Sequence, residues 1–195
     1  MYLSIKRLLD IVCSIVFIIL LSPLFIVIIG FIQKNIFYFH PRVGFKGRLF
    51  KVIKFRSMKV DNRELKDILK KDQLDEYYKN YKIKNDPRIT RVGRVLRRLS
   101  LDELPQLFNI LKGEMSFVGP RPITIEEINR LDEKKKACYL SVKPGLTGLW
   151  AVNGRSSIDF DKRIDYEIFY VNNRSFWLDL KIIIKTIFVF FKDSL

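Results

Sequence analysis

An uncharged, strongly hydrophobic run of 22 residues occupies Ile11–Ile32. A helix of that length is long enough to cross a lipid bilayer. Ser22-Pro23 stands in the middle of the run, where proline removes a backbone hydrogen bond and kinks a helix. Basic residues flank both ends, and the positive-inside rule places such ends in the cytoplasm. The pattern therefore predicts a re-entrant helix that enters and leaves the membrane through one leaflet.

Two other interpretations of this run compete with the re-entrant helix. A signal peptide would have a shorter hydrophobic region followed by a small-residue cleavage site, and neither feature is present. A plain transmembrane helix is the commoner outcome for so long an apolar run. The proline break counts against that helix, as do Lys6 and Arg7 before the run and Lys34 and Arg42 after it.

Basic and apolar residues alternate between Phe37 and Met58, around Gly44 and Gly47. Alternation with a period of two is typical of β-strands, and glycines in the middle indicate a turn. This stretch predicts a short β-hairpin that turns near Phe45–Gly47. The simplest interpretation of its lysines and arginines is a basic strand pair lying on lipid headgroups.

Helical spacing continues after the predicted hairpin. Asp61–Lys84 is mixed in charge, and its leucines and tyrosines predict a peripheral helical insertion. Asp86-Pro87 has the N-cap residue and first-position proline of a helix start. Arginines then recur every three or four residues over an apolar face. Further on, Thr124 and Glu127 form a capping-box pattern, which predicts a charged helix through Lys136.

The C-terminal segment is amphipathic. Trp177 stands near its start, Lys181 and Lys185 fall on one helical face, and isoleucines and phenylalanines cover much of the remainder. This pattern predicts a helix lying in the membrane interface, with a core helix as the simpler alternative. The predicted elements together give a mostly helical α+β fold. Residues 1–36 hold the re-entrant helix and its flanks, and residues 37–195 form one domain with a small β-hairpin and interfacial helices.

Charge and composition narrow the functional classes. The net charge of +15 is unevenly placed, since the first 60 residues carry ten Lys and Arg against one acid, Asp10. Anionic membrane and nucleic acid are both candidate partners for such a surface. Cys13 and Cys138 lack metal-ligand spacing and indicate a reducing compartment rather than a disulfide framework. His40 is the only histidine, which argues against a histidine-built metal site or a Ser-His-Asp triad.

The candidate chemistry lies in an adjacent carboxylate pair, Asp102 and Glu103, just after a run of arginines. Ser100 and Glu103 have capping-box spacing, and Pro105 is tolerated only near a helix start, so we expect the pair in a first helical turn. Free N–H groups there stabilise an ionised carboxylate and a phosphate beside it. The simplest interpretation is a helix cap. The basic approach on one side and Gly-Pro-Arg-Pro, ending at Pro122, on the other favour a phosphoryl-transfer site.

The stretch S-L-D-E-L-P-Q-L-F-N-I-L-K-G-E-M-S-F-V-G-P-R-P, Ser100–Pro122, resembles the signature of the bacterial sugar transferase family. These are monotopic phosphoglycosyl transferases that begin glycan assembly on polyprenol phosphate. The resemblance extends in the same order to four further motifs: K-F-R-S-M (Lys54–Met58), D-P-R-I-T-R-V-G-R (Asp86–Arg94), K-P-G-L-T-G (Lys143–Gly148) and N-G-R (Asn153–Arg155). It therefore covers nearly the whole chain.

The resemblance implies an activity and roles for particular residues. A sugar 1-phosphate would pass from a UDP-sugar to undecaprenyl phosphate with release of UMP, at the cytoplasmic face of the bacterial inner membrane, as the first membrane step of a surface glycan. Asp102 would be the nucleophile and Glu103 would hold Mg²⁺. The family also has a re-entrant helix with a Ser-Pro break, which matches Ser22 and Pro23. Phosphate-binding roles would fall to Lys54, Arg56, Arg97, Arg121 and Arg155.

Two alternatives from other classes remain open at this point. A non-enzymatic basic membrane adaptor would explain the charge but leave the carboxylate pair and Gly-Pro-Arg-Pro without a purpose. A nucleic-acid-binding protein held at the membrane would bind duplex DNA with a steep salt dependence. We expect the partners to be a UDP-sugar, undecaprenyl phosphate and the lipid bilayer, and no nucleic acid. The sequence leaves open the sugar, the glycan, the polyprenol length and whether the chain forms a homodimer.

Overall fold

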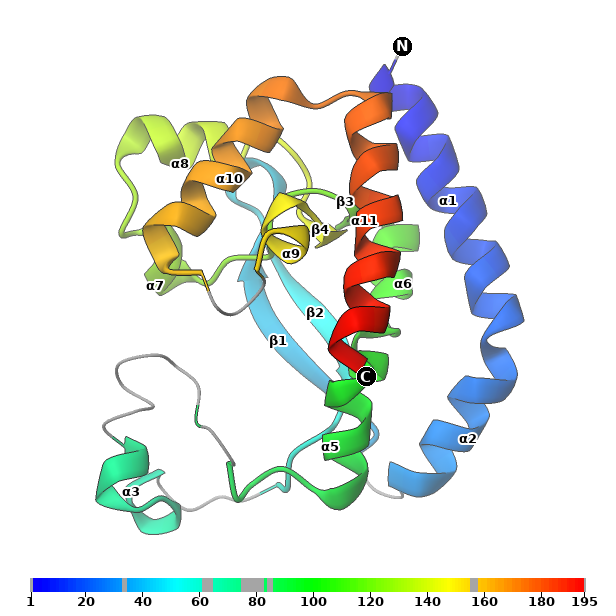
Figure 1. Cartoon of the computed structure of the whole chain (residues 1–195), viewed down its shortest axis with the longest axis vertical. Coiled ribbons are helices and arrows are strands. Elements are labelled where there is room, and N and C mark those ends of the chain that lie inside the picture. Colours follow the sequence, from blue (N-terminus) through cyan, green and yellow to red (C-terminus); the bar gives the residue numbers. More distant parts are fainter. Residues whose placement is uncertain are drawn as a thin grey trace.

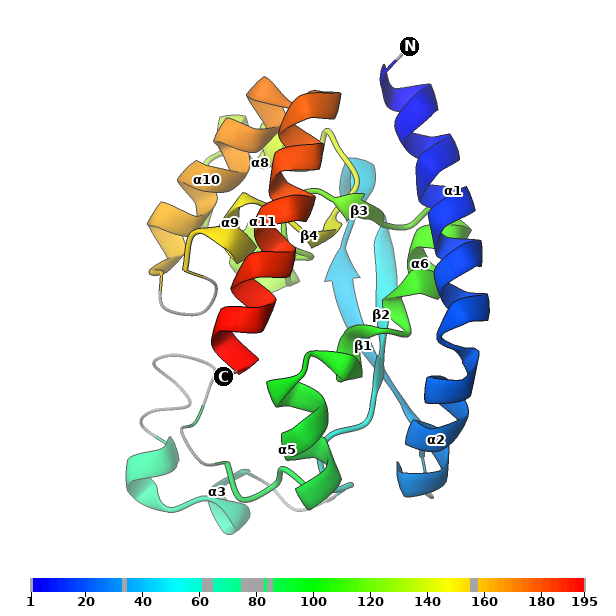
Figure 2. The same cartoon turned by 45° about the vertical axis from the view of Figure 1, so that its right-hand side comes forward.

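The protein is a helix-rich α+β structure built around one β-hairpin, as the computed structural model shows from two sides (Figures 1 and 2). The structure describes residues 2–32, 35–60, 65–74, 83, 86–154 and 158–194. The expected mostly helical α+β class is thus confirmed. In chain order the elements are α1 (Tyr2–Leu20), α2 (Ser22–Ile32), β1 (Phe37–Val43), the 3₁₀ turn η1 (Phe45–Gly47), β2 (Leu49–Phe55), α3 (Leu65–Ile68), α5 (Arg91–Arg98), the 3₁₀ turn η2 (Leu101–Glu103), α6 (Gln106–Lys112), β3 (Ser116–Val118), α7 (Ile125–Ile128), α8 (Glu133–Tyr139), β4 (Gly145–Thr147), α9 (Leu149–Val152), α10 (Phe160–Asn173) and α11 (Phe176–Ser194).

The predicted hairpin is present, with its turn at the predicted place. β1 and β2 pair antiparallel, and Lys46 and Gly47 adopt left-handed conformations in the turn (φ 56° and 76°). Opposed residues of an antiparallel pair share a face, and so do residues two apart along a strand. Tyr38 lies opposite Lys54 and His40 lies opposite Val52. Tyr38, His40 and Lys54 therefore lie on one face of the hairpin.

A second, parallel sheet of β3 and β4 was not predicted. Each strand has three residues, too few to show a readable alternation. The strands approach closely at two glycines, since a Cβ on Gly145 would lie only 2.1 Å from the backbone nitrogen of Gly119. This contact between distant segments leaves no local pattern in the sequence.

The uncharged N-terminal run breaks at the predicted place. α1 and α2 are bent by 61° on either side of Leu21. Pro23 has no N–H to donate to the Ile19 carbonyl four residues earlier. The Ser22 hydroxyl donates to that carbonyl instead, at 2.8 Å. Within the described part of the chain, no helix alone has the length and apolar composition of a membrane span, whereas α1 and α2 meet both conditions as a bent pair.

Polar side chains tie one face of α1 to the rest of the protein. The guanidinium of Arg7 donates to two carbonyl oxygens in the last turn of α6, at 2.6 and 2.8 Å. The buried carboxylate of Asp10 accepts from the Ser116 hydroxyl at the start of β3 (3.1 Å). Lys6 Nζ lies 2.5 Å from Asp179 Oδ2 on α11. These contacts orient α1, and its apolar residues fill the remaining faces.

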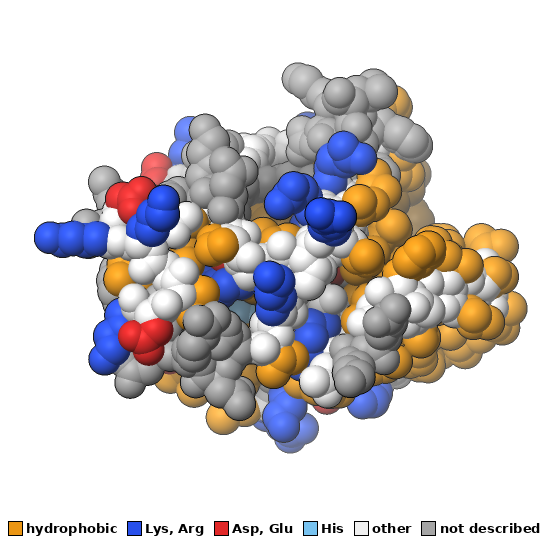
Figure 3. Space-filling model, turned by 90° about the horizontal axis from the view of Figure 1, so that it is seen from below, with side chains coloured by type: hydrophobic (Ala, Val, Ile, Leu, Met, Phe, Trp, Pro, Cys, Tyr) orange, Lys and Arg blue, Asp and Glu red, His pale blue; other side chains and the backbone are white. Residues whose placement is uncertain are grey.

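Large hydrophobic side chains remain exposed on α1, α2 and α11. We call these residues the apolar face: Leu3, Ile5, Leu8, Leu9, Val12, Ile15, Val16, Phe17, Ile19, Leu20, Ile26, Val27, Phe31, Phe176, Trp177, Leu180, Ile183, Ile184, Ile187 and Phe188. Seen from below, lysine and arginine side chains gather beside hydrophobic side chains (Figure 3). Apolar exposure on this scale is typical of a surface that contacts a membrane or another protein.

The helix start predicted at Asp86-Pro87 is wrong. α5 begins at Arg91, not at Asp86-Pro87, and Thr90 is its N-cap through a hydrogen bond from the Gly93 N–H (2.8 Å). Asp86 is buried, and its carboxylate forms a bidentate pair with the Arg88 side chain (2.6 and 2.9 Å) instead of capping a helix.

Most of the predicted insertion over Asp61–Lys84 lies outside the described residues. The described part includes α3 and a further helical turn at residues 71–74.

The predicted capping box at Ser100 is also wrong. Ser100 adopts a left-handed conformation (φ 51°), and its side chain makes no capping hydrogen bond. The reason is that α5 ends immediately before it, so Ser100 turns the chain out of one helix rather than opening the next. The 3₁₀ turn η2 follows, and α6 begins only at Gln106.

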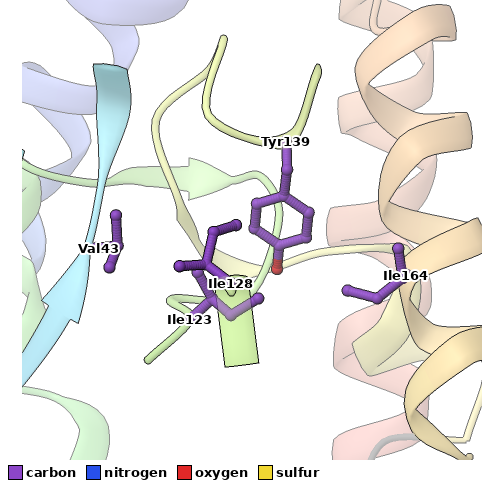
Figure 4. Packing of buried hydrophobic residues seen from close by; sticks show 5 residues of the cluster. All are labelled: Val43, Ile123, Ile128, Tyr139 and Ile164. Atoms are coloured by element: carbon purple, nitrogen blue, oxygen red, sulfur yellow. The ribbon is translucent and has the colours of Figure 1, made fainter. Parts of the chain in front are cut away.

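The second predicted capping box is confirmed, with Thr124 and Glu127 bonding reciprocally at the start of α7. The helix does not reach Lys136, however, because α7 ends at Ile128 and α8 begins afresh with Asp132 as its N-cap. These short helices enclose a buried cluster of Val43, Ile123, Ile128, Tyr139 and Ile164 (Figure 4). The cluster is linked to the Gly-Pro-Arg-Pro segment, because the Tyr139 hydroxyl donates to the Arg121 carbonyl.

Candidate active site

Asp102 and Glu103 lie in the 3₁₀ turn between α5 and α6. The Glu103 N–H donates to the Ser100 carbonyl (3.2 Å) and the Leu104 N–H to the Leu101 carbonyl (3.3 Å), which is the 3₁₀ pattern. Asp102 is only 9% exposed, whereas the Glu103 side chain keeps 36% of its surface. The turn therefore buries one carboxylate and presents the other to a ligand.

One cation pairs with the turn, and a second lies in the helix just before it. Lys54 extends from β2, and its Nζ lies 2.7 Å from Glu103 Oε1. Arg97 is in the last turn of α5, where its Nε donates to the Ser57 hydroxyl just after β2 (2.8 Å). The hairpin and α5 thus bring together residues that are forty or more positions apart in the sequence.

Burial and nearby charges act on the pKa of Asp102. The pKa of Asp102 is raised to about 6, mainly by burial and in smaller part by the neighbouring charge of Glu103. Lys54 and Arg97 act in the opposite direction because they favour the ionised form. A carboxyl group with this pKa is largely ionised at neutral pH. The turn therefore holds a poorly hydrated carboxylate beside positive charge.

The backbone of Arg121 is held from both sides. Its N–H donates to Glu167 Oε1 on α10 (3.0 Å), and its carbonyl accepts from the Tyr139 hydroxyl on α8 (2.7 Å). Both partners are buried, at 0% and 3% exposure. The guanidinium lies over the ring of Trp150, 5.0 Å from its centroid. These contacts hold the Arg121 side chain in the wall of a cavity that Glu103 also lines.

Glu167 makes the stability of this support depend on pH. Burial raises the pKa of Glu167 to about 8, although the Arg121 N–H and the charges of Arg163 and Arg121 lower it in part. An unfolded chain would release the proton near pH 4.3. Between about pH 4.3 and pH 8 the folded protein therefore binds more protons than the unfolded chain, so this group's stabilisation falls as pH rises.

We expect Glu167→Gln to remove that pH dependence, because glutamine keeps the hydrogen bond from the Arg121 N–H and cannot ionise. The melting temperature of the variant minus that of the wild type should become more positive between pH 5 and pH 8. Thermal unfolding of both proteins across this range measures the difference, and other titrating groups cancel in the subtraction. A difference that stayed constant with pH would show that Glu167 keeps an ordinary pKa.

A small cavity of about 70 Å³ lies beside Glu103, and we call it the basic pocket. Its walls come from the hairpin, α6, the Gly-Pro-Arg-Pro segment and the start of β4 and α9: His40, Arg42, Val52, Lys54, Glu103, Gln106, Arg121, Pro122, Gly145, Leu146 and Trp150. Burial and the nearby charges of Arg42 and Lys54 lower the pKa of His40 to about 4, so it is neutral at physiological pH. Three cations and one carboxylate give the pocket a net positive charge that suits an anionic ligand.

Two polar atoms of the pocket residues are buried without a hydrogen-bond partner, Arg42 Nη1 and Trp150 Nε1. Buried donors in folded proteins are nearly always satisfied, so such atoms indicate a missing acceptor. Both residues line the basic pocket, where the oxygens of a phosphorylated ligand would satisfy them. Neither residue was among the predicted binding residues. The alternation of the hairpin could have identified Arg42, since it is two positions from His40 and on the same face.

The structure brings some predicted site residues together and separates others. Lys54, Glu103 and Arg121 line the basic pocket, and Arg97 lies beside them at Ser57. Arg56 does not line it, because its guanidinium donates to the carbonyls of Asn35 and Phe37 (2.7 and 3.2 Å). Arg155 lies outside the described residues.

Comparisons with known proteins place this geometry in context. The profile of a family described as bacterial sugar transferase matches residues 1–193. Undecaprenyl-phosphate galactose phosphotransferase of Salmonella typhimurium is 49% identical over 187 residues, 93% of this chain. UDP-glucose:undecaprenyl-phosphate glucose-1-phosphate transferase of Klebsiella pneumoniae is 41% identical over 194 residues, 94% of this chain.

The chain spans only 39% of the length of each of those two relatives. A shorter relative, the exopolysaccharide production protein ExoY of Sinorhizobium fredii, is 43% identical over 189 residues, which cover 93% of this chain and 83% of the relative. The likeness therefore covers almost all of this chain, whatever the length of the relative.

Proposed function

The chain belongs to the bacterial sugar transferase family, and on that premise we propose that it transfers a sugar 1-phosphate from a UDP-sugar to undecaprenyl phosphate and releases UMP. The names of the Salmonella and Klebsiella relatives support this activity. The observation that carries the proposal is the buried Asp102 carboxylate with Lys54 and Arg97 beside it. An anionic nucleophile can approach an anionic diphosphate only where cations offset the repulsion. The product would be the first membrane-bound intermediate of a surface glycan.

In the first half-reaction, a carboxylate oxygen of Asp102 attacks the β-phosphorus of the UDP-sugar. A new oxygen–phosphorus bond forms, and the bond from that phosphorus to the bridging oxygen breaks. UMP leaves with the bridging oxygen and the electron pair. The sugar phosphate remains on Asp102 as an acyl phosphate. Burial of Asp102 suits this step because it limits the access of water, which would hydrolyse the intermediate.

In the second half-reaction, a phosphate oxygen of undecaprenyl phosphate attacks the same phosphorus. A diphosphate bond forms, the bond to Asp102 breaks, and the carboxylate is regenerated. The two displacements require no other nucleophile, which agrees with a basic pocket whose histidine, His40, is neutral.

The cations of the site bind the diphosphate and offset the charge that UMP gains as it leaves. Arg121 is held by its backbone, and its planar guanidinium donates to two phosphate oxygens at once. The charges of Lys54 and Arg97 favour the ionised form of the attacking carboxylate. Arg42 and Trp150 contribute the buried donors that lack partners in the protein. Together they form a preorganised anion site.

Mg²⁺ fits the Glu103 side of this site. Among the residues described, no group of three or more His, Cys, Asp or Glu side chains could hold a metal ion alone. Mg²⁺ instead favours one or two carboxylates together with substrate phosphates and water. Glu103 is partly exposed and already pairs with a cation, the Lys54 ammonium. Glu103 would therefore hold the ion, which when bound neutralises charge on the diphosphate.

The same proposal places the protein at the cytoplasmic face of the bacterial inner membrane. α2 and the second half of α1 would enter one leaflet as a re-entrant unit, and α11 would lie in the interface. The bent α1–α2 pair and the exposed apolar face support this placement. α2 is also held near the site, because its Phe25 packs on Phe55 of β2 with ring centroids 5.3 Å apart. The lipid phosphate would then meet the carboxylate turn at headgroup depth.

The position of residue 2 tests this topology. A single cysteine at that position, with Cys13 and Cys138 replaced by serine, should resist a membrane-impermeant thiol reagent in intact cells and react after permeabilisation. Pro23→Ala restores the helical hydrogen bond and should straighten the pair, so part of the population should span the membrane and become labelled from outside. Labelling of the unmodified helix pair in intact cells would rule out the re-entrant topology.

The activity itself is tested by UMP release. Purified protein with undecaprenyl phosphate, Mg²⁺ and each member of a UDP-sugar panel should release UMP with at least one sugar and form a lipid-linked sugar diphosphate. If no sugar supported release while the protein bound duplex DNA with a steep salt dependence, the nucleic-acid alternative would replace the proposal.

A further inference from the structure

A second and much larger cavity, about 720 Å³, lies between α1 and α11. Residues of both helices line it, as do residues of α6 and β3. Figure 2 shows α6 and β3 between α1 and α11. Hydrophobic side chains form most of its wall, including Leu9 and Phe17 of α1, Leu107 of α6, and Ile183 and Ile187 of α11. Its volume is typical of a site for a small organic ligand.

This cavity adjoins the basic pocket. Glu103, Leu146 and Trp150 line both spaces, and Ser100, Leu101 and Leu104 of the carboxylate turn also line the larger one. The lining therefore changes from charged to apolar across the width of a few side chains. A ligand that occupied both spaces would need an anionic group attached directly to a hydrocarbon chain.

The charged residues of the large cavity fix the direction of such a ligand. Apart from Glu103, its charged lining residues are Lys6, Asp10 and Asp179. Lys6 pairs with Asp179 (2.5 Å), and Asp10 accepts hydrogen bonds from β3, so these charges are satisfied within the protein. The cations suited to a phosphate, including Lys54 and Arg121, are in the basic pocket. The phosphate end therefore belongs in the basic pocket, and the hydrocarbon end lies between the helices.

We propose that the cavity between α1 and α11 holds the phosphate-proximal part of the acceptor's isoprenoid chain. This inference rests on the proposed function, because it states where the lipid substrate of that reaction lies. A polyprenyl phosphate has its phosphate directly on the chain, which matches the short distance from charged to apolar lining. In a phospholipid a glycerol unit and two ester groups separate the phosphate from two acyl chains, so a phospholipid fits the transition less well.

Cys13 provides a probe that needs no substitution. It lies on α1, is half-buried and lines the cavity, whereas Cys138 on α8 lies elsewhere, with its Sγ near Asn172 Oδ1 (3.6 Å). The protein in phospholipid nanodiscs would be treated with a small thiol reagent, and the modification rates of both cysteines followed by peptide mass spectrometry. Undecaprenyl phosphate at about ten times its dissociation constant should slow modification of Cys13 about tenfold and leave Cys138 unchanged.

The outcomes separate the proposals. An unchanged Cys13 rate at an acceptor concentration that saturates turnover would overturn the cavity assignment, and so would equal protection by added phosphatidylglycerol. Protection of Cys13 in a protein that releases no UMP from any UDP-sugar would contradict the proposed activity and leave the lipid site standing.

A pair of adjacent substitutions tests the cavity by kinetics. Ile183 lines it and its neighbour Ile184 does not, although both are exposed to a similar extent on α11 (40% and 46%). Ile183→Trp should raise the KM for undecaprenyl phosphate about tenfold or more by overfilling the space, and leave UMP release in the first half-reaction unchanged. Ile184→Trp should alter neither. Equal acceptor kinetics for the two variants would contradict the assignment.

Discussion

Replacing Asp102 with asparagine should abolish both turnover and the formation of a covalent intermediate. Asparagine keeps the size and shape of the side chain but lacks the charged oxygen that attacks phosphorus. Loss of a nucleophile costs about 10⁶-fold in enzymes that act through a covalent intermediate. The position of Asp102 supports this expectation, because its carboxylate is buried and only 9% of the residue is exposed.

The measurement uses a UDP-sugar labelled in the sugar, with Mg²⁺ and without lipid acceptor. Wild-type protein should retain label on the chain and release up to one UMP per molecule, and Asp102→Asn should do neither. Near-normal turnover of Asp102→Asn would contradict the covalent mechanism.

Two further variants of the site should lose less activity than Asp102→Asn. Arg97→Ala removes one donor of the anion site and should leave slow turnover, reduced about a hundred- to a thousandfold. Glu103→Gln keeps the nucleophile but weakens the hold on Mg²⁺, so a part of its activity should return as Mg²⁺ is raised. The three variants therefore differ in kind: no label, slow labelling, and labelling that depends on the metal concentration. A uniform loss in all three would indicate damage to the fold.

Gly93→Ala should destabilise the protein and slow the reaction although it touches no substrate. Gly93 lies in α5 against the strand end, and a Cβ there would be 1.9 Å from the Ser57 carbonyl oxygen. That backbone atom cannot swing aside, so α5 must move away. We expect the free energy of unfolding to fall by about 1–3 kcal/mol. Arg97 would lose its contact with Ser57, and a displacement of about 1 Å at the carboxylate turn would cost about a hundredfold in turnover.

Gly30→Ala is the matched control for this prediction. Gly30 is also within a helix, α2, but nothing lies within 4 Å of the position where its Cβ would be. Alanine is the better helix former, so stability should be unchanged or slightly higher. Thermal unfolding and UMP release for both variants, in the same detergent, would separate crowding at Gly93 from the general effect of adding a methyl group. Equal stability of the two variants would mean that α5 does not pack as closely as the structure indicates.

Part of the site could be predicted because its signals are local. The break at Ser22-Pro23 follows from a missing N–H and a hydroxyl one residue away. The hairpin follows from alternation over fourteen paired residues and a glycine turn. The adjacency of Asp102 and Glu103 is covalent, so any fold keeps the two carboxylates together.

Local signals misled where the chain packs tightly on itself. Ser100 has capping-box spacing, yet the end of α5 and the short turn to α6 leave it left-handed and without a capping bond. Asp86 has the pattern of a helix start, yet its bidentate pair with Arg88 occupies it. A local pattern predicts the structure that a short segment would favour alone, and contacts with the rest of the protein can stabilise a different structure.

The sequence by itself determined the mostly helical α+β class, the bent N-terminal pair, the hairpin and the carboxylate pair, because each depends on neighbouring residues. Only the tertiary structure decided that Arg42 and Trp150 join Lys54 and Arg121 in one pocket, that Arg56 is directed to backbone carbonyls, and that Glu167 and Tyr139 hold Arg121. These contacts join residues that are far apart in the chain. They depend on tight packing, such as that of Gly119 against Gly145, which cannot be predicted from the residues next to either position.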